Sequence, residues 1–145
     1  MAILIDDGYP IIFKQKRVGY HKTEIIIHKF RSMKVSNDNT PKYANDEQHR
    51  ITKVGNFIRR TRLDELPQLY DVLIGRMSII GPRPEQIYFS NLIEQQTVEY
   101  GLRYNVKPGI TGWAQINWKY TFTPEDTIHK LEFDLYYIAN KNFLM

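Results

Sequence analysis

Two short runs of β-branched and aromatic residues stand near the start of the chain. These runs, Ile11–Phe13 and Glu24–Ile27, are separated by a polar segment that contains Gly19. Apolar runs bounded by polar residues and glycine are typical of strands. The pattern predicts an antiparallel hairpin, and the many lysines and arginines around it would make that hairpin basic.

A helical repeat of apolar positions dominates the middle of the chain. It follows a polar stretch, residues 36–48, which is predicted to be a surface loop. Apolar residues recur at helical spacing over residues 51–60 and again over residues 63–73. Pro67 is tolerated only in the first turn of a helix, because it lacks an amide hydrogen and clashes with the preceding turn. Two helices should therefore meet near Asp64.

Stiff turns and two further helices are predicted for the second half of the chain. The segment Gly81–Pro84 contains two prolines, which fix their own φ and push the residues before them toward extended geometry. Residues 108–113 form a second turn-rich segment. Helices are expected from Glu85 to about residue 94 and from Thr123 to about residue 139.

The composition supports one folded domain of the α+β class, in which a small basic hairpin packs with several helices. The 145 residues are 42% hydrophobic and 25% charged, so a single domain over residues 1–145 can bury a core. The absence of cysteine excludes a disulfide framework and a thiolate metal site. Apolar runs of only a few residues fall far below the roughly 20 that span a bilayer, so no membrane span is predicted.

Positive charge is concentrated in the amino-terminal half. Between Lys14 and Lys34 there are seven lysines and arginines against one acid, and between His49 and Arg62 there are five against none. Such clustering indicates a surface that faces anions.

Two adjacent carboxylates, Asp64 and Glu65, lie among these arginines. Either Asp64 or Thr61 could cap the following helix, which would leave both acids near free backbone amides. A carboxylate can attack a phosphoryl group once arginines and a divalent cation offset the repulsion between the two anions. The alternative is structural, because acids at a helix start commonly do no more than stabilise the helix dipole. The pair alone does not decide between the two.

Six ordered segments carry a resemblance to a known family. They are Phe13–Gly19, Lys29–Met33, Leu63–Leu69, Met77–Pro84, Lys107–Gln115 and Glu132–Ile138. Together they resemble the bacterial sugar transferases, the monotopic phosphoglycosyl transferases that start polysaccharide and glycan assembly.

The resemblance implies transfer of a sugar 1-phosphate from a UDP-sugar to undecaprenyl phosphate, with UMP leaving. The residue that matches the family's nucleophile is Asp64, which would attack the β-phosphate and become a phosphosugar ester. The neighbouring Glu65 would assist, and Mg²⁺ would bridge Asp64 and the diphosphate. The lipid phosphate would then attack the ester, which gives ping-pong kinetics.

Eight further residues are candidates for substrate binding, and most are cations. They are Arg17, Lys29, Arg31, Arg59, Arg83, Lys107, Lys119 and Asp134. A guanidinium suits a phosphate because it donates two parallel hydrogen bonds. The cations on or beside the hairpin, Arg17, Lys29 and Arg31, could equally contact anionic lipid head groups. Asp134 lies among apolar positions of the last helix, so it could point inward to an arginine instead of toward substrate.

Family members carry a hydrophobic membrane helix before the matched region and continue beyond it, so this chain is expected to be truncated. The full-length protein would work at the cytoplasmic face of the bacterial inner membrane, whereas this chain could be soluble. One alternative is a folded remnant that binds UDP-sugar or an anionic membrane surface without turnover. A nucleic-acid binder is a third possibility, but nucleic acid requires neither Leu63–Leu69 nor Gly81–Pro84, and no such partner is expected.

Overall fold

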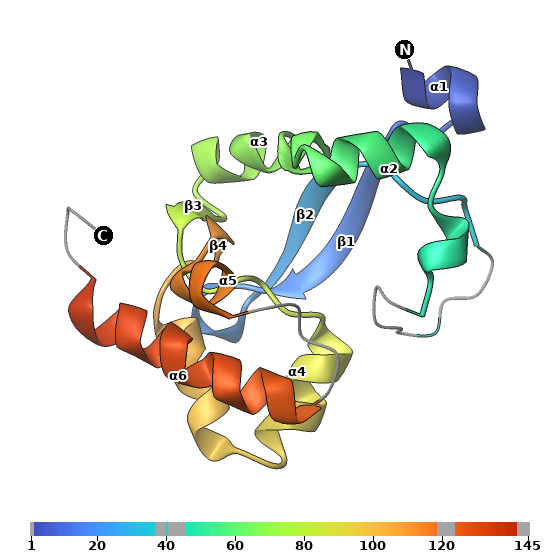
Figure 1. Cartoon of the computed structure of the whole chain (residues 1–145). Helices are drawn as coiled ribbons and strands as arrows, with labels where there is room; N and C mark the ends of the chain where they lie inside the picture. The colour runs from blue at the N-terminus through green and yellow to red at the C-terminus, as the bar shows by residue number, and fades with distance from the viewer. Residues whose placement is uncertain (1, 37–39, 41–45, 119–123, 142–145) are drawn as a thin grey trace.

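A two-stranded antiparallel hairpin crosses the middle of the fold (Figure 1). The computed structural model describes residues 2–36, 40, 46–118 and 124–141. Strands β1 (Ile12–Val18) and β2 (Glu24–Phe30) pair along their whole length, and the short 3₁₀ helix η1 (Tyr20–Lys22) joins them. Ile25 and Ile27 are buried while Ile26 between them is exposed, as expected for a strand with one face on the core. The predicted basic hairpin is confirmed.

Three helical segments lie along one side of the hairpin. Helix α2 (Lys53–Arg60), the 3₁₀ turn η3 (Leu63–Glu65) and helix α3 (Gln68–Leu73) follow one another almost in line (Figure 1). The side chain of Thr52 accepts the amide of Gly55 and so caps α2. The prediction of two helices that meet near Asp64 is confirmed.

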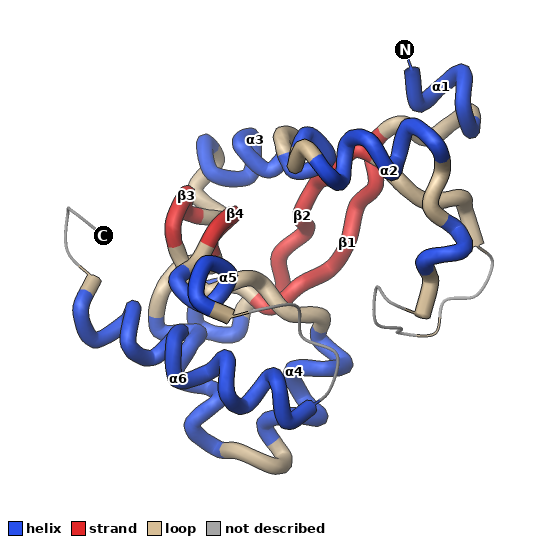
Figure 2. Tube along the Cα trace, viewed as in Figure 1, coloured by secondary structure: helices blue, strands red, loops and turns tan. Residues whose placement is uncertain are grey.

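A second helical group lies on the other side of the hairpin (Figure 2). It comprises α4 (Ile87–Glu94), the 3₁₀ segment η4 (Val98–Asn105) and α6 (Pro124–Asn140). These elements enclose a hydrophobic core with Val18 of β1, and its members are Val18, Phe89, Ile93, Tyr100, Tyr104 and Leu131. The two predicted helices are thus present, within two residues of the expected bounds that the structure describes.

A small parallel sheet joins the two segments predicted as turns, Gly81–Pro84 and residues 108–113. Strand β3 (Ser78–Ile80) pairs with β4 (Gly109–Thr111), and the short helix α5 (Trp113–Asn117) follows. The backbones approach so closely that a Cβ on Gly109 would lie 2.2 Å from the amide nitrogen of Gly81. The segment predicted as a turn therefore contains a strand, because Gly109 fits directly against Gly81.

The remaining elements are short. Helix α1 (Ala2–Asp7) precedes the hairpin, and the 3₁₀ turn η2 (Gln48–Arg50) begins at the end of the predicted loop, residues 36–48, most of which falls outside the described residues. Helices with two small sheets confirm the α+β class. In the part of the chain that the structure describes, no helix combines the length and apolar character needed to span a membrane.

Candidate functional site

The adjacent carboxylates lie at the junction between α2 and α3. Arg62 adopts a left-handed conformation with φ of 59°, which ends α2 and turns the chain into η3, where Asp64 and Glu65 are both buried. The capping prediction is wrong, because Thr61 donates its hydroxyl to carbonyls of α2 and α3 begins after Pro67 without a side-chain cap. The tight turn, not a helix cap, brings the two acids together.

Glu65 is held by two cations. Arg83 donates to both carboxylate oxygens, at 2.5 Å to Oε1 and 3.4 Å to Oε2, and Lys29 Nζ donates to Oε1 at 3.2 Å. Burial alone would raise the pKa of Glu65, but the hydrogen bonds and charges of Arg83 and Lys29 outweigh it and lower the pKa to about 2. Glu65 is therefore a fixed anion that orients both cations.

Asp64 has the opposite environment. Its side chain is 9% exposed, and within the described structure its Oδ1 atom is buried without a hydrogen-bond partner. Burial raises the pKa of Asp64, and the charge of Glu65 adds to the effect, while Lys29, Arg59 and Arg83 partly offset it. An unpaired carboxylate oxygen keeps its lone pairs available for an electrophile or a cation. The two neighbours thus differ: two cations orient Glu65, whereas one oxygen of Asp64 has no hydrogen-bond partner in the described structure.

Three cations, two from the hairpin and one from the Gly81–Pro84 loop, line a small cavity beside Glu65. Arg17 of β1, Lys29 of β2 and Arg83 share it with Ile27, Gln68 and Pro84. Burial lowers the pKa of Arg17 to about 10 and that of Lys29 to about 8, and the like charge of Arg83 contributes to both shifts. Arg83 differs, because burial alone would lower its pKa but its hydrogen bond to Glu65 and the charges of Glu65, Glu85 and Asp64 raise it. Arg17 and Lys29 are therefore the two cations of the cavity that a further anion would stabilise most.

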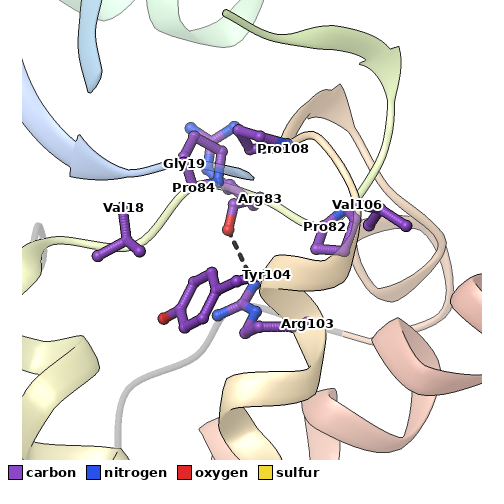
Figure 3. A pocket seen from close by; sticks show the side chains of 9 residues that line it. All are labelled: Val18, Gly19, Pro82, Arg83, Pro84, Arg103, Tyr104, Val106 and Pro108. Atoms are coloured by element: carbon purple, nitrogen blue, oxygen red, sulfur yellow. Dashed lines mark hydrogen bonds between the residues drawn. The ribbon is translucent and has the colours of Figure 1, made fainter. Parts of the chain in front are cut away.

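The loop that carries Arg83 is supported by a buried ion pair, for which the sequence indicated Asp134 as one partner but did not identify the arginine. Arg103 of η4 donates to the carbonyl oxygen of Arg83 at 2.8 Å (Figure 3). Its Nη2 also lies 2.9 Å from Oδ2 of Asp134 on α6. The Arg103 guanidinium also lies over the ring of Tyr100, 4.8 Å from its centroid. Asp134 accordingly takes the inward alternative: it pairs with Arg103 instead of facing the cavity, so its assignment to substrate binding is corrected.

The other predicted binding residues are dispersed. Arg31 is buried and donates to the carbonyl oxygens of Asp7, Gly8 and Tyr9, so its fork secures the amino-terminal turn and is not available to substrate, which corrects that assignment. Lys107 is exposed beside the turn after α3. Lys119 lies outside the described residues.

A second buried pair, also missed from the sequence, fixes α3 against the hairpin. His28 Nδ1 lies 2.8 Å from Oδ1 of Asp71, and the backbone amide of His28 donates to Oδ2 at 2.9 Å. Asp71 is fully buried. Because His28 is next to Lys29 on β2 and Asp71 lies on the helix that follows Glu65, this pair holds α3 against the strand that carries Lys29.

The polarity of the η3–α3 segment is inverted relative to a common surface helix. Its polar residues Gln68 and Asp71 face inward, whereas the apolar residues that predict the helix are exposed. Those exposed residues are Leu63, Leu66, Leu69, Tyr70, Leu73 and Ile74. An apolar strip of this kind beside a polar site marks a contact surface.

The sequence as a whole matches one family. Residues 1–145 match the family described as Bacterial sugar transferase. The chain belongs to the bacterial sugar transferase family. The resemblance carried by the six segments is therefore confirmed.

Curated members of the bacterial sugar transferase family include close relatives of this chain. It is 50% identical over 141 residues to a UDP-glucose:undecaprenyl-phosphate glucose-1-phosphate transferase of Escherichia coli (strain K12), covering 95% of this chain and 30% of the relative. It is 44% identical over 141 residues to a UDP-N-acetylgalactosamine-undecaprenyl-phosphate N-acetylgalactosaminephosphotransferase of Aeromonas hydrophila, covering 97% and 33%. An exopolysaccharide production protein of Rhizobium leguminosarum bv. phaseoli is 37% identical over 152 residues, covering 100% and 76%. The chain spans about a third of the length of the first two relatives.

Proposed function

We propose that this chain transfers a sugar 1-phosphate from a UDP-sugar to undecaprenyl phosphate through a covalent intermediate on Asp64, the first step of polysaccharide assembly. The observation that carries the proposal is the unpaired, buried Oδ1 of Asp64 next to a neighbour whose charge is fully engaged. The substrates follow from the names of the relatives, which act on undecaprenyl phosphate and UDP-sugars.

The cation-lined cavity provides the electrostatic conditions for the first step. Arg17, Lys29 and Arg83 reduce the charge of the diphosphate, so that the anionic Asp64 can approach it. An Asp64 oxygen attacks the β-phosphorus, and the bond from that phosphorus to the oxygen bridging the two phosphates breaks. UMP leaves with the electron pair of that bond. A sugar phosphate remains bound to the carboxylate as a mixed anhydride.

The second step restores the enzyme. An oxygen of undecaprenyl phosphate attacks the same phosphorus, and the bond to Asp64 breaks, which regenerates the carboxylate and forms the polyprenyl diphosphate sugar. No proton has to move in either step, since both nucleophiles and both leaving groups are anions. Glu65 contributes by holding Lys29 and Arg83 in place, a role that fits its low pKa better than proton transfer does.

The residues of the site fit a Mg²⁺ ion that is held jointly by Asp64 and by the phosphates of the substrate. Among the described residues no group of three or more acidic, histidine or cysteine side chains could hold a metal alone. Mg²⁺ keeps several waters and commonly uses one or two carboxylates with substrate phosphates, so the unpaired Oδ1 of Asp64 is a suitable ligand. When bound, the ion would supply positive charge to the diphosphate oxygens.

The lipid acceptor implies a membrane surface, which we place at the exposed apolar strip of η3 and α3 on the cytoplasmic face of the inner membrane. The strip is continuous with the turn that carries Asp64, and the exposed cations Arg60 and Arg62 precede it. Apolar side chains flanked by basic ones favour anionic bilayers. A lipid phosphate at that surface would lie close to the nucleophile.

The proposal is tested by isotope exchange without a lipid acceptor. The 145-residue chain is incubated with Mg²⁺, labelled UMP and a panel of UDP-sugars, and we expect label to enter the UDP-sugar that is the substrate. Asp64→Asn should abolish exchange, and Asp46→Asn, at an exposed acid elsewhere, should leave it unchanged. Binding of UMP with no exchange for any sugar would instead indicate a chain that binds nucleotide without turnover.

A further inference from the structure

The side chain of Gln68 is buried in the cavity without a role in the steps above. Gln68 is 1% exposed, and its Nε2 has no hydrogen-bond partner in the described structure. It lines the same cavity as Arg17, Lys29 and Arg83. A buried amide that donates to nothing is unfavourable, since it has lost water and gained no acceptor. Native structures rarely retain such a group unless a missing partner completes it.

The chemistry of the cavity walls identifies that partner. Arg17, Lys29 and Arg83 offer donors only, because neither a guanidinium nor an ammonium group can accept a hydrogen bond. The acceptors close to these cations are already engaged. Glu65 accepts from Arg83 and Lys29, Gln15 and the carbonyl oxygen of Pro84 accept from Arg17, and Glu85 forms an ion pair with Arg17 at 3.5 Å. A ligand that satisfies the Gln68 amide must therefore bring its own acceptor oxygens and tolerate three positive charges. A phosphate group has both properties.

The position of Gln68 follows from the same packing that builds the site. It is the first residue of α3, on the inward face that also carries the buried Asp71, which His28 anchors to β2. An amide adds a donor to the cavity without adding a fourth positive charge that would repel the others. The anchored helix thus presents Gln68 at a fixed place and orientation.

We propose that Gln68 donates a hydrogen bond to a phosphate oxygen bound between Arg17, Lys29 and Arg83, and so contacts substrate directly. The phosphate belongs either to the nucleotide sugar or to the polyprenyl phosphate acceptor. The proposal deepens the proposed function and rests on the same site, but it concerns binding and does not require Asp64 to react.

The test separates a binding role from a structural one. Gln68→Met keeps the length of the side chain and removes its donor, and Gln95→Met is the control at an exposed glutamine. We measure the affinity of the 145-residue chain for UMP and for geranyl phosphate by calorimetry with Mg²⁺, and the melting temperature without ligand. Loss of a hydrogen bond to a charged group predicts about tenfold weaker binding. The melting temperature should stay unchanged or rise, because the unsatisfied donor is gone.

Each arm of the experiment identifies the source of the phosphate. Weaker binding of UMP alone assigns Gln68 to the nucleotide sugar, weaker binding of geranyl phosphate alone assigns it to the acceptor, and a loss in both indicates one shared position. Unchanged affinity for both ligands overturns the proposal. A lower melting temperature with affinity unchanged in the folded fraction also overturns it, since it shows a structural role.

A measurement on the unmodified protein covers the case in which Gln68→Met does not fold. In the ¹³C,¹⁵N-labelled chain, the side-chain amide of Gln68 should shift downfield and exchange more slowly with water when UMP or geranyl phosphate binds. An unperturbed amide at saturating ligand contradicts the proposal. Repeating the titration with Asp64→Asn distinguishes the two claims: a retained Gln68 response without UMP exchange leaves the binding role intact and removes only the function of Asp64.

Discussion

Removal of one partner of the ion pair between Arg103 and Asp134 should be among the most destabilising single substitutions in the fold. The two side chains are 2% and 3% exposed, and Arg103 Nη2 lies 2.9 Å from Asp134 Oδ2. The same guanidinium donates to the carbonyl oxygen of Arg83. In Asp134→Asn the shape of the side chain is kept, but the Arg103 charge is left buried without a counter-ion.

The size of the effect follows from that burial. Removing one partner of a buried pair costs about 3–5 kcal/mol, because the remaining charge cannot regain water. For a domain of this length each kcal/mol lowers the melting temperature by about 2–4 °C, so a fall of about 10 °C is expected. The double variant Arg103→Met/Asp134→Asn should lose less than the sum of the two single variants, since neither charge is then left alone.

Chemical denaturation with urea and a thermal scan measure these changes. The matched control is Lys16→Met, which breaks the pair between Lys16 and Glu24: its length is 2.8 Å, but the side chains are 67% and 48% exposed. Loss of that exposed pair should cost less than about 1 kcal/mol. If Asp134→Asn is no less stable than Lys16→Met, the account of a buried, uncompensated guanidinium is wrong.

Three further predictions concern charge and surface. Because the pKa of Lys29 is lowered to about 8, affinity for UMP should fall as the pH rises through 8, and Lys29→Arg should remove that dependence in a calorimetric titration. The pKa of Glu65 in the folded state lies below its ordinary value of 4.5. Ionised Glu65 therefore adds at most about 3 kcal/mol to the free energy of unfolding, and this stabilisation is present above pH 4.5 and lost as the pH falls toward 2. Glu65→Gln should lack that part of the acid transition in urea denaturation, and an identical acid limb would contradict the ion network. Leu73→Gln should weaken sedimentation with phosphatidylglycerol vesicles, whereas Val98→Gln, equally exposed on η4, should not.

The sequence was sufficient for the hairpin and the longer helices, but not for the small parallel sheet or for the direction in which α3 faces. Alternating and helical periods predicted the hairpin, α2, α4 and α6, because these periods depend on local backbone geometry. The same helical period predicts α3, but it does not show whether the apolar face of that helix packs against the rest of the protein or is exposed. The pairing of Asp71 with His28, two residues far apart in the chain, holds the polar side inward.

The site was predictable where its residues belong to short motifs. Asp64, Glu65, Lys29 and Arg83 were all candidates, and the structure brings them together. Arg31 was misjudged, because a cation on a basic hairpin is equally compatible with solvent, a ligand or backbone carbonyls until its neighbours are known. Buried ion pairs were the hardest part of the site to predict, because they join residues that are distant in sequence.

The sequence also contained a signal for the arginine that pairs with Asp134. Arg103 stands between Tyr100 and Tyr104 at helical spacing, and Asp134 stands between apolar residues of the last helix. Two opposite charges, each on an apolar face, must find partners if those faces are buried. Matching them would have predicted the Arg103–Asp134 pair.

The most direct test of the central claim is to locate the covalent intermediate. The chain is incubated with Mg²⁺ and UDP-sugars without acceptor, quenched with hydroxylamine and digested with trypsin, which releases Leu63–Arg76 as one peptide. We predict a hydroxamate on Asp64, formed only with the substrate sugar and absent from Asp64→Asn. A hydroxamate on Glu65 or Asp71, or transfer to undecaprenyl phosphate by the Asp64→Asn chain, would contradict the account.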